Sequence, residues 1–459
     1  MTKTKSYEMD MCSGSLLKKM LVYALPIMFS GVLQLLFNAA DIVVVGRFAG
    51  DNSLAAVGST SSVIQLLTNL FIGLSVGANV LVAQYYGAKD EQSLQDTIHT
   101  SMLLSFLCGI ILTILGVATA RPILKMMQAP PEVLEKAIIY MRIYFLGMTA
   151  TMVYDFGSAI MRAVGDTQRP LYFLLLAGIV NVILNLFFVI VLHMDVAGVA
   201  LATSISQTIS AVLVVRCLLK NRGALQLHPK KLRVKKYVFT RILQIGLPSG
   251  ATGVVFSLSN VVIQSAINSF GEIVIAGNSA AYNIEGFVFT AVNGFYQAVI
   301  SFTSQNFGAQ KIRRIPRILG VGILYSALFS ILLTAIALGF GRQLLGIYTE
   351  NPEVIQEGYY RMCILLGTYI IASSMDVFSG GLRGMGYSMG PMIISLVGVC
   401  GFRLVWIATV FQMERFHTLL CLYACYPITW VITTTAMGLC FLWVYKKVRC
   451  QTNVQDSMT

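Results

Sequence analysis

A polar row interrupts the first long apolar stretch of this 459-residue chain. Gln34, Asn38 and Asp41 are separated by four and three residues, so they share one face of a helix. An ionisable group inside an apolar stretch of spanning length is costly, and it is usually functional or paired. The spacing therefore marks Asp41 as a candidate for chemistry that needs a buried carboxylate. Gln34 and Asn38 are candidates for a substrate site or a second coupling site.

Two amides and a hydroxyl in later apolar stretches complete a possible site. Asn181 and Asn185 are one helical turn apart, and Thr203 lies in the next stretch. With Asp41 they would form an oxygen cage for a hard monovalent cation such as Na⁺; alternatively, a desolvated Asp41 would carry a proton. A third interpretation is that these residues only join helices by hydrogen bonds.

A second set of polar residues lies in the other half of the chain. Glu285 has no acidic counterpart in the first half, which suggests a specialised task. Tyr282 and Asn283 are further candidates because they neighbour it. The alternative is a structural ion pair between Glu285 and Arg403.

Asp155 and Asp376 occupy equivalent places in the two halves. Each precedes an arginine, Arg162 or Arg383, by seven residues, which is two turns of one helix face. Both acids are interpreted either as anchors of a helix end or as partners of a nearby base.

The composition shows what must position these residues. The chain is 56% hydrophobic and only 12% charged, against roughly 25% charged in an ordinary soluble protein. Apolar runs of spanning length predict twelve membrane helices. They are expected near residues 20–46, 58–83, 98–120, 137–160, 171–192, 198–219, 242–268, 278–303, 318–340, 358–381, 391–411 and 418–445.

The bases fix the expected orientation. If both termini are cytoplasmic, most of the 33 Lys and Arg residues fall in cytoplasmic segments, including the acid-free stretch 220–241. The net charge of +13 is explained in this way, and no nucleic-acid-binding motif accompanies it. We expect membrane lipids as partners and no nucleic acid.

The two halves of the sequence repeat each other. Polar residues and prolines recur 221 residues apart over most of the chain: QYYGAK as QNFGAQK, Pro131 as Pro352, and Asp155 as Asp376. Each copy has six helices, so both enter the membrane from the same side, related by a pseudo-twofold axis along the membrane normal. The predicted fold is an all-α polytopic membrane protein with two six-helix bundles.

These motifs together resemble the multidrug and toxic compound extrusion (MATE) transporters over roughly residues 15–446. They are ALPIMFSGVLQLLFNAADIVVVG, QYYGAK, QNFGAQKIRRI, IMRAVGDTQRP, GLRGMGYSMGP and AGVALATSISQ. The resemblance implies export of organic cations or amphiphilic drugs by alternating access, in exchange for inward Na⁺ or H⁺. It also implies that Asp41, Asn181 and Thr203 form the cation site of the first lobe. For the second lobe it implies that Glu285 serves cation recognition or protonation and that Asp376 is a candidate for a second coupling site. Many members have an aspartate where this chain has Asn185, which leaves the coupling ion open.

The predicted organisation follows from the repeat. It has a cytoplasmic tail (1–19), an N-lobe (20–219), a basic linker (220–241), a C-lobe (242–447) and a second tail (448–459). We expect a monomer in a bacterial inner membrane with both termini cytoplasmic, no cofactor and no metal beyond Na⁺. A lipid-linked oligosaccharide flippase of the related superfamily is the alternative function. No catalytic motif supports an enzyme, and no P-loop supports an ATP-driven pump.

Overall fold

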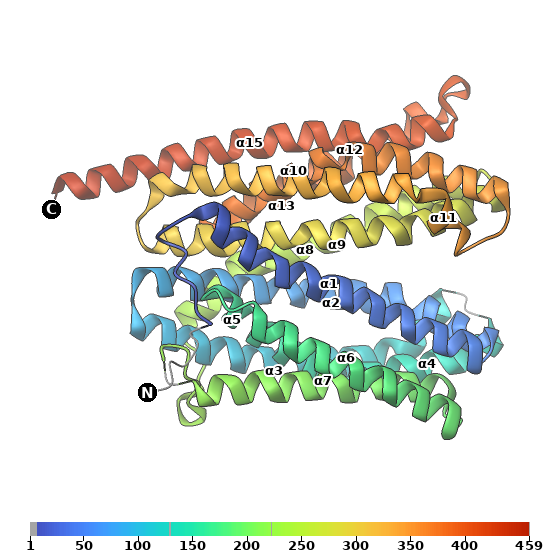
Figure 1. The fold of residues 1–459 in the computed structure, drawn as a ribbon, viewed down its shortest axis with the longest axis horizontal. Coiled ribbons are helices and arrows are strands. Elements are labelled where there is room, and N and C mark those ends of the chain that lie inside the picture. The colour runs from blue at the N-terminus through green and yellow to red at the C-terminus, as the bar shows by residue number, and fades with distance from the viewer. Residues whose placement is uncertain (1–6, 128–129, 222, 459) are drawn as a thin grey trace. The chain divides into compact units, whose positions relative to one another are not determined.

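The computed structural model describes residues 7–127, 130–221 and 223–458, and the regular structure in these ranges is helical (Figure 1). The predicted stretches correspond, in order, to α1 (Leu16–Phe48), α2 (Asp51–Ala88), α3 (Glu91–Met126), α4 (Pro131–Leu146) with α5 (Met148–Ala163), α6 (Gln168–Leu186) with η1 (Phe187–Val191), α7 (Asp195–Lys220), α8 (Lys236–Asn268), α9 (Glu272–Gly308), α10 (Ile315–Gly339), α12 (Pro352–Gly384), α13 (Met389–Ser395) through η4 (Leu396–Gly401), α14 (Phe402–Ala408) and η5 (Val410–Gln412), and α15 (Leu419–Met458).

Most of these helices suit a membrane by length and composition. In the described ranges, ten are long and apolar enough to cross one, and α4 with α5 makes an eleventh span that bends by 45°. Gly147 occupies the bend, and a Cβ there would lie 2.7 Å from the Ser204 Oγ of α7, so the break allows close packing. The remaining helix, α9, has 37 residues and is not among these candidate spans. The all-α fold with twelve long helical segments is confirmed.

The chain forms two compact units. The first contains Phe29–Gly250 and the described residues up to Asp10; the second contains Met11–Met28 and the described residues from Ala251 onward. Helices α1 and α8 are each divided between the units, and Pro26 and Pro248 each lie two residues before the division. The predicted lobe boundaries were drawn between helices, whereas these divisions fall inside two of them.

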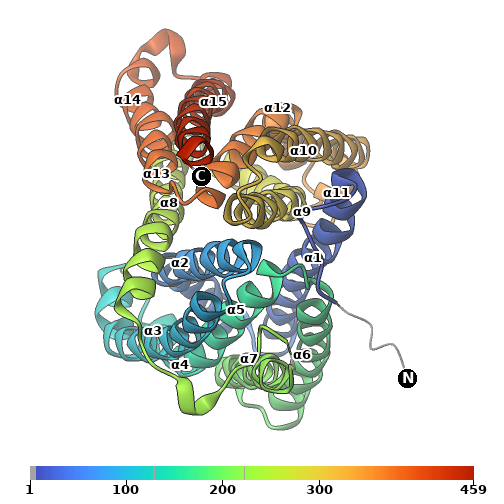
Figure 2. The ribbon, with the colours of Figure 1, turned by 90° about the vertical axis from the view of Figure 1, so that its left-hand side faces the viewer.

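Each unit has its own helical core. In the first, α2, α3 and α5 pack against one another, and α7 packs against α4, α5 and α6 (Figure 1). In the second, α12 packs against α9, α10 and α15, which are seen nearly end-on in Figure 2. Aromatic rings reinforce this second core: those of Phe289 on α9 and Tyr369 on α12 stack with centroids 4.3 Å apart.

The repeat recurs in the backbone. Three pairs of positions 221 residues apart have nearly equal positive φ angles, a conformation that L-residues rarely adopt. They are Gly50 (86°) with Gly271 (91°), Lys89 (57°) with Gln310 (57°), and Gly165 (97°) with Gly386 (88°). The matching motifs therefore code for matching turns between helices.

Candidate functional site

Asp41 lies inside the first unit and is only 9% exposed. The Asn185 Nδ2 of α6 donates a hydrogen bond to the Asp41 Oδ1. The Thr203 Oγ1 of α7 lies 3.4 Å from the Asp41 Oδ2 and 3.0 Å from the Val199 carbonyl oxygen, and its one hydrogen can be donated to either acceptor. Side chains from α6 and α7 thus contact one carboxylate of α1.

Asn181 closes these contacts into a ring. Its Nδ2 donates to the Thr203 Oγ1 at 3.4 Å, and its Oδ1 accepts from the Asn185 Nδ2 at 3.3 Å. Both asparagines are buried, and the Asn185 Oδ1 has no hydrogen-bond partner among the described residues. The structure therefore brings together the four residues predicted for cation coupling, and we call Asp41, Asn181, Asn185 and Thr203 the Asp41 ring.

Two local features position the Asp41 ring. Gly178, one turn before Asn181, lets α6 approach α1 closely: a Cβ there would lie 1.8 Å from the Phe37 Cε2. Directly after the asparagines, the helix changes to the π-helical turn η1, a feature that is frequent at functional sites. The other π-helical segment, η4, does not lie 221 residues later, so the repeat is broken beside the ring.

Gln34 and Asn38 do not join the Asp41 ring. Both side chains are exposed, and neither has a hydrogen bond to Asp41 in the described part of the chain. Gln34 lies two turns and Asn38 one turn before Asp41 on α1, and both side chains are exposed although Phe37 of the same stretch packs against Gly178 of α6. The shared helix face was predicted from spacing, but spacing does not predict which part of that face a neighbouring helix covers.

Glu285 is sealed in an ion pair. Its carboxylate is fully buried, with the Arg361 Nη2 of α12 at 2.8 Å from one oxygen and the Nε at 3.1 Å from the other. Two parallel bonds of this kind give a strong, geometrically specific pair. The predicted alternative, an ion pair between Glu285 and Arg403, is wrong. The Arg403 Cζ lies 4.2 Å from the centroid of the Tyr426 ring, and Arg403 donates a hydrogen bond to the Thr429 Oγ1.

The ion pair continues into a polar network. The Arg361 Nη1 donates to the Asn278 Oδ1 at 2.7 Å, and the Asn278 Nδ2 donates to the Gln264 Oε1 at 2.9 Å. Arg361 also lies near the rings of Tyr423 and Tyr426. All these groups belong to the second unit, so the network ties α8, α9, α12 and α15 together.

Tyr282 and Asn283 lie apart from Glu285. Tyr282 is 53% exposed, and the exposed Asn283 donates to the Ser279 carbonyl oxygen of its own helix at 3.0 Å. Neighbouring positions of a helix point in different directions, so closeness in sequence did not place them beside the buried carboxylate.

Asp376 is half-buried and has no hydrogen bond or ion pair in the described ranges. Arg383, two turns later, donates instead to the hydroxyl groups of Tyr296 and Thr252. Asp155 is likewise half-buried without an ion pair in the part of the chain that the structure describes. Neither acid forms the contact ion pair that the seven-residue spacing suggested.

Arg361 is the principal residue that the sequence analysis missed. It lies near the start of the predicted span 358–381 and was assigned to the outer end of that helix. The structure starts α12 at Pro352, nine residues earlier, so Arg361 lies inside the helix and is only 3% exposed. Proline at the first helical position is a start signal that places Arg361 well inside the helix, but it does not predict the pairing with Glu285.

Comparisons with known proteins agree with this architecture. The model of the MatE family matches residues 26–187 and again residues 248–408, which are the two copies of the repeat. The chain is 26% identical to the probable multidrug resistance protein YoeA of Bacillus subtilis, over 94% of this chain and 95% of that protein. It is also 26% identical to the probable multidrug resistance protein NorM of Thermotoga maritima, over 84% of each.

Solved structures share the fold. A transporter of the MOP superfamily from Pyrococcus furiosus, described as having a binding pocket of reverse polarity, superimposes with a TM-score of 0.90 at 22% identity, covering 98% of this chain and all of that one. An outward-facing multidrug resistance MATE family transporter gives a TM-score of 0.87, also at 22% identity, covering 96% and 98%. With more than half of its residues matched by the family model, the chain belongs to the MatE family of membrane transporters and is not an enzyme.

Proposed function

We propose that this chain is a secondary active exporter of small organic cations and amphiphilic compounds, working by alternating access in a bacterial plasma membrane. Both termini lie in the cytoplasm. The observation that carries the proposal is one carboxylate, Asp41, buried in a helical bundle and held by Asn185 and Thr203. Binding of a cation there neutralises a buried charge and so stabilises the conformation that buries Asp41. An ion gradient can therefore shift the equilibrium between the conformations of the transporter.

The proton is the coupling ion that we propose. The Asp41 ring has a single acid, and the amide nitrogen of Asn185, a hydrogen-bond donor, lies against the oxygens of Asp41 and Asn181. A bare Na⁺ would need oxygens in that place. Na⁺ is the second candidate, because the buried Asn185 Oδ1 has no hydrogen-bond partner in the described part of the chain. Rotation of the Asn185 side-chain amide by about 180° would turn this oxygen toward the Asp41 carboxylate, where it could bind Na⁺.

The cargo class is supported by the descriptions of two relatives, and the contacts of Glu285 argue against its use in cargo binding. YoeA and NorM carry the description multidrug resistance protein. Glu285 is already neutralised by Arg361, so we assign this pair to structure and not to cargo binding. The exposed side chains of Gln34, Asn38, Tyr282 and Asn283 are the polar groups that we propose for cargo contacts.

The test is transport by the purified protein in liposomes, using a fluorescent organic cation. An acidic lumen is expected to drive accumulation of the dye, and an equal Na⁺ gradient without a pH difference is not. Accumulation driven by Na⁺ alone would overturn the proton and favour Na⁺. Movement of lipid-linked saccharides without any movement of the dye would replace the exporter by the flippase alternative.

A further inference from the structure

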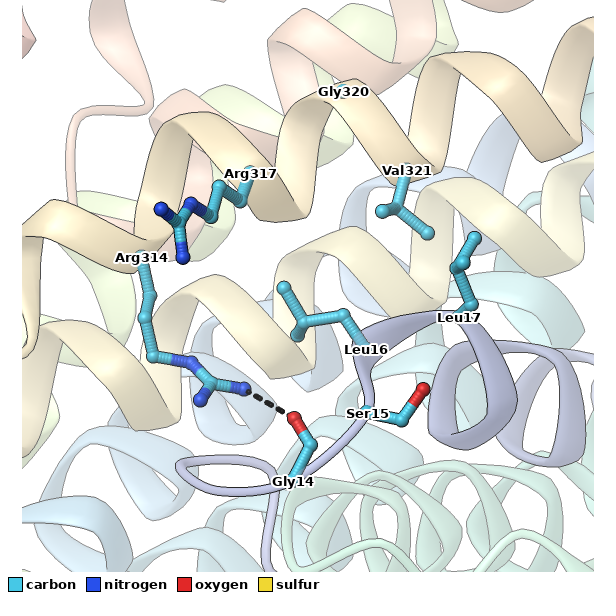
Figure 3. A pocket seen from close by; sticks show the side chains of 8 residues that line it. All are labelled: Gly14, Ser15, Leu16, Leu17, Arg314, Arg317, Gly320 and Val321. Atoms are coloured by element: carbon cyan, nitrogen blue, oxygen red, sulfur yellow. Dashed lines mark hydrogen bonds between the residues drawn. The ribbon is translucent and has the colours of Figure 1, made fainter.

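A basic hollow lies in the second unit, where α1 and α10 begin. It has a volume of about 480 Å³ and is lined by residues 14–17 and by Arg314, Arg317 and Val321, among others (Figure 3). The Arg314 Nη2 donates to the Gly14 carbonyl oxygen at 3.3 Å, which holds the chain before α1 against the start of α10. Because Met11–Met28 belong to this unit, the hollow is formed within one compact body.

The charge of this hollow is uncompensated. Among the described residues, no carboxylate pairs with Arg314 or Arg317, and Arg317 makes no hydrogen bond. A second hollow of about 320 Å³ shares Arg314 and adds Lys311, Arg313 and Arg449, again with no acid in its lining. Guanidinium groups bind phosphate oxygens well, so the two hollows together favour an anionic phosphate ligand.

An apolar track leads away from the hollow. Val321 lines it, and α10 continues with large apolar side chains about half exposed, at the spacing of one helix face: Leu324 (49%), Leu328 (51%) and Leu332 (54%). Leu17 on α1, 46% exposed, is also part of the wall. A free phosphate ion would make no apolar contact with these side chains, whereas the acyl chains of a lipid would pack against them.

We propose that this hollow binds the phosphate headgroup of an anionic phospholipid from the leaflet predicted to be cytoplasmic. Arg314 and Arg317 bind the phosphate, and the acyl chains lie along the apolar face of α10. The bound lipid thereby holds the start of α1 on the second unit. Basic pockets between membrane helices on the cytoplasmic side are a recognised arrangement for anionic headgroups.

The test uses the full-length protein, stripped of lipid in detergent, with native mass spectrometry to count bound phosphatidylglycerol. Phosphatidylcholine and inorganic phosphate are the comparison ligands. Arg317→Gln removes a cation that makes no hydrogen bond in the described structure, so it should fold normally. We expect phosphatidylglycerol to bind roughly five-fold more weakly to Arg317→Gln and roughly ten- to thirty-fold more weakly to the double variant Arg314→Gln/Arg317→Gln.

The matched control is Lys230→Gln/Lys231→Gln, which removes two cations from the linker in the first unit. It should leave phosphatidylglycerol binding unchanged. An equal loss in this control would mean that general charge attracts the lipid, and it would overturn the proposed site. Equal binding of phosphatidylcholine, or displacement of the lipid by millimolar inorganic phosphate, would overturn it as well.

Discussion

Arg361 and Glu285 form a two-point ion pair inside the second unit, with N–O distances of 2.8 and 3.1 Å and almost no exposure of either side chain. Burying two charges is expensive, and their attraction compensates only when both remain. Four helices meet at this pair through Asn278, Gln264 and the tyrosine rings. The acid that broke the sequence repeat therefore has a structural partner.

Removing one member of the pair should be severe. We expect Arg361→Met to lower the free energy of unfolding by about 3–5 kcal/mol, because it leaves a buried carboxylate alone. The double variant Glu285→Leu/Arg361→Met should recover most of that loss. Thermal unfolding in detergent measures both effects, and a double variant no more stable than Arg361→Met would contradict the pairing.

The same double variant separates structure from function. If the only role of Glu285 is to neutralise the charge of Arg361, the double variant should still transport the fluorescent cation. Its rate per amount of folded protein should lie within about three-fold of the wild-type rate. A folded double variant without transport would show that Glu285 has a role in cargo recognition or ion coupling after all.

Gly178 offers a test of the packing that forms the Asp41 ring. A Cβ at this position would lie 1.8 Å from the Phe37 Cε2, so Gly178→Ala should push α6 away from α1. We expect a loss of about 1–3 kcal/mol in stability and weaker ion-driven transport. Adding Phe37→Ala should restore transport, because it removes the atoms that clash.

Gly58→Ala is the control for this change. Gly58 lies on α2 in the same unit, with nothing within 4 Å of its Cβ position, so alanine should be neutral or slightly stabilising there. If Gly58→Ala impaired transport as much as Gly178→Ala, the cause would be helix stiffness and not the contact between α1 and α6.

The fold was predictable because its signals are local and repeated. Apolar runs predicted the twelve helical segments, and the 221-residue repeat predicted turns that the backbone angles confirm at Lys89 and Gln310. Spacing predicted that Asn181 and Asn185 share a helix face, and the resemblance to MATE transporters implied that Asn181 and Thr203 meet Asp41. Arg361 was missed because its pairing depends on how α9 and α12 pack, which no local pattern of charge encodes.

Asn185 provides a test of ion choice. Asn185→Asp would place a second carboxylate against Asp41, and two neighbouring acids attract a cation or share a proton more strongly than one. We expect this variant to gain thermal stability on addition of Na⁺, by several degrees, where the wild type gains none. Asn38→Asp adds the same charge at an exposed position of α1 and should show no response to Na⁺. A wild type as responsive to Na⁺ as Asn185→Asp would contradict proton coupling.

The most direct test of the account is transport by Asp41→Asn, a nearly isosteric change that removes the charge from the ring. In liposomes with an acidic lumen, we expect accumulation of the fluorescent cation to fall at least ten-fold, while exchange of the dye without a gradient continues. Asp195→Asn, an acid of the same unit paired with Lys136 outside the ring, should keep its pH-driven accumulation. Undiminished pH-driven accumulation by Asp41→Asn would contradict the account.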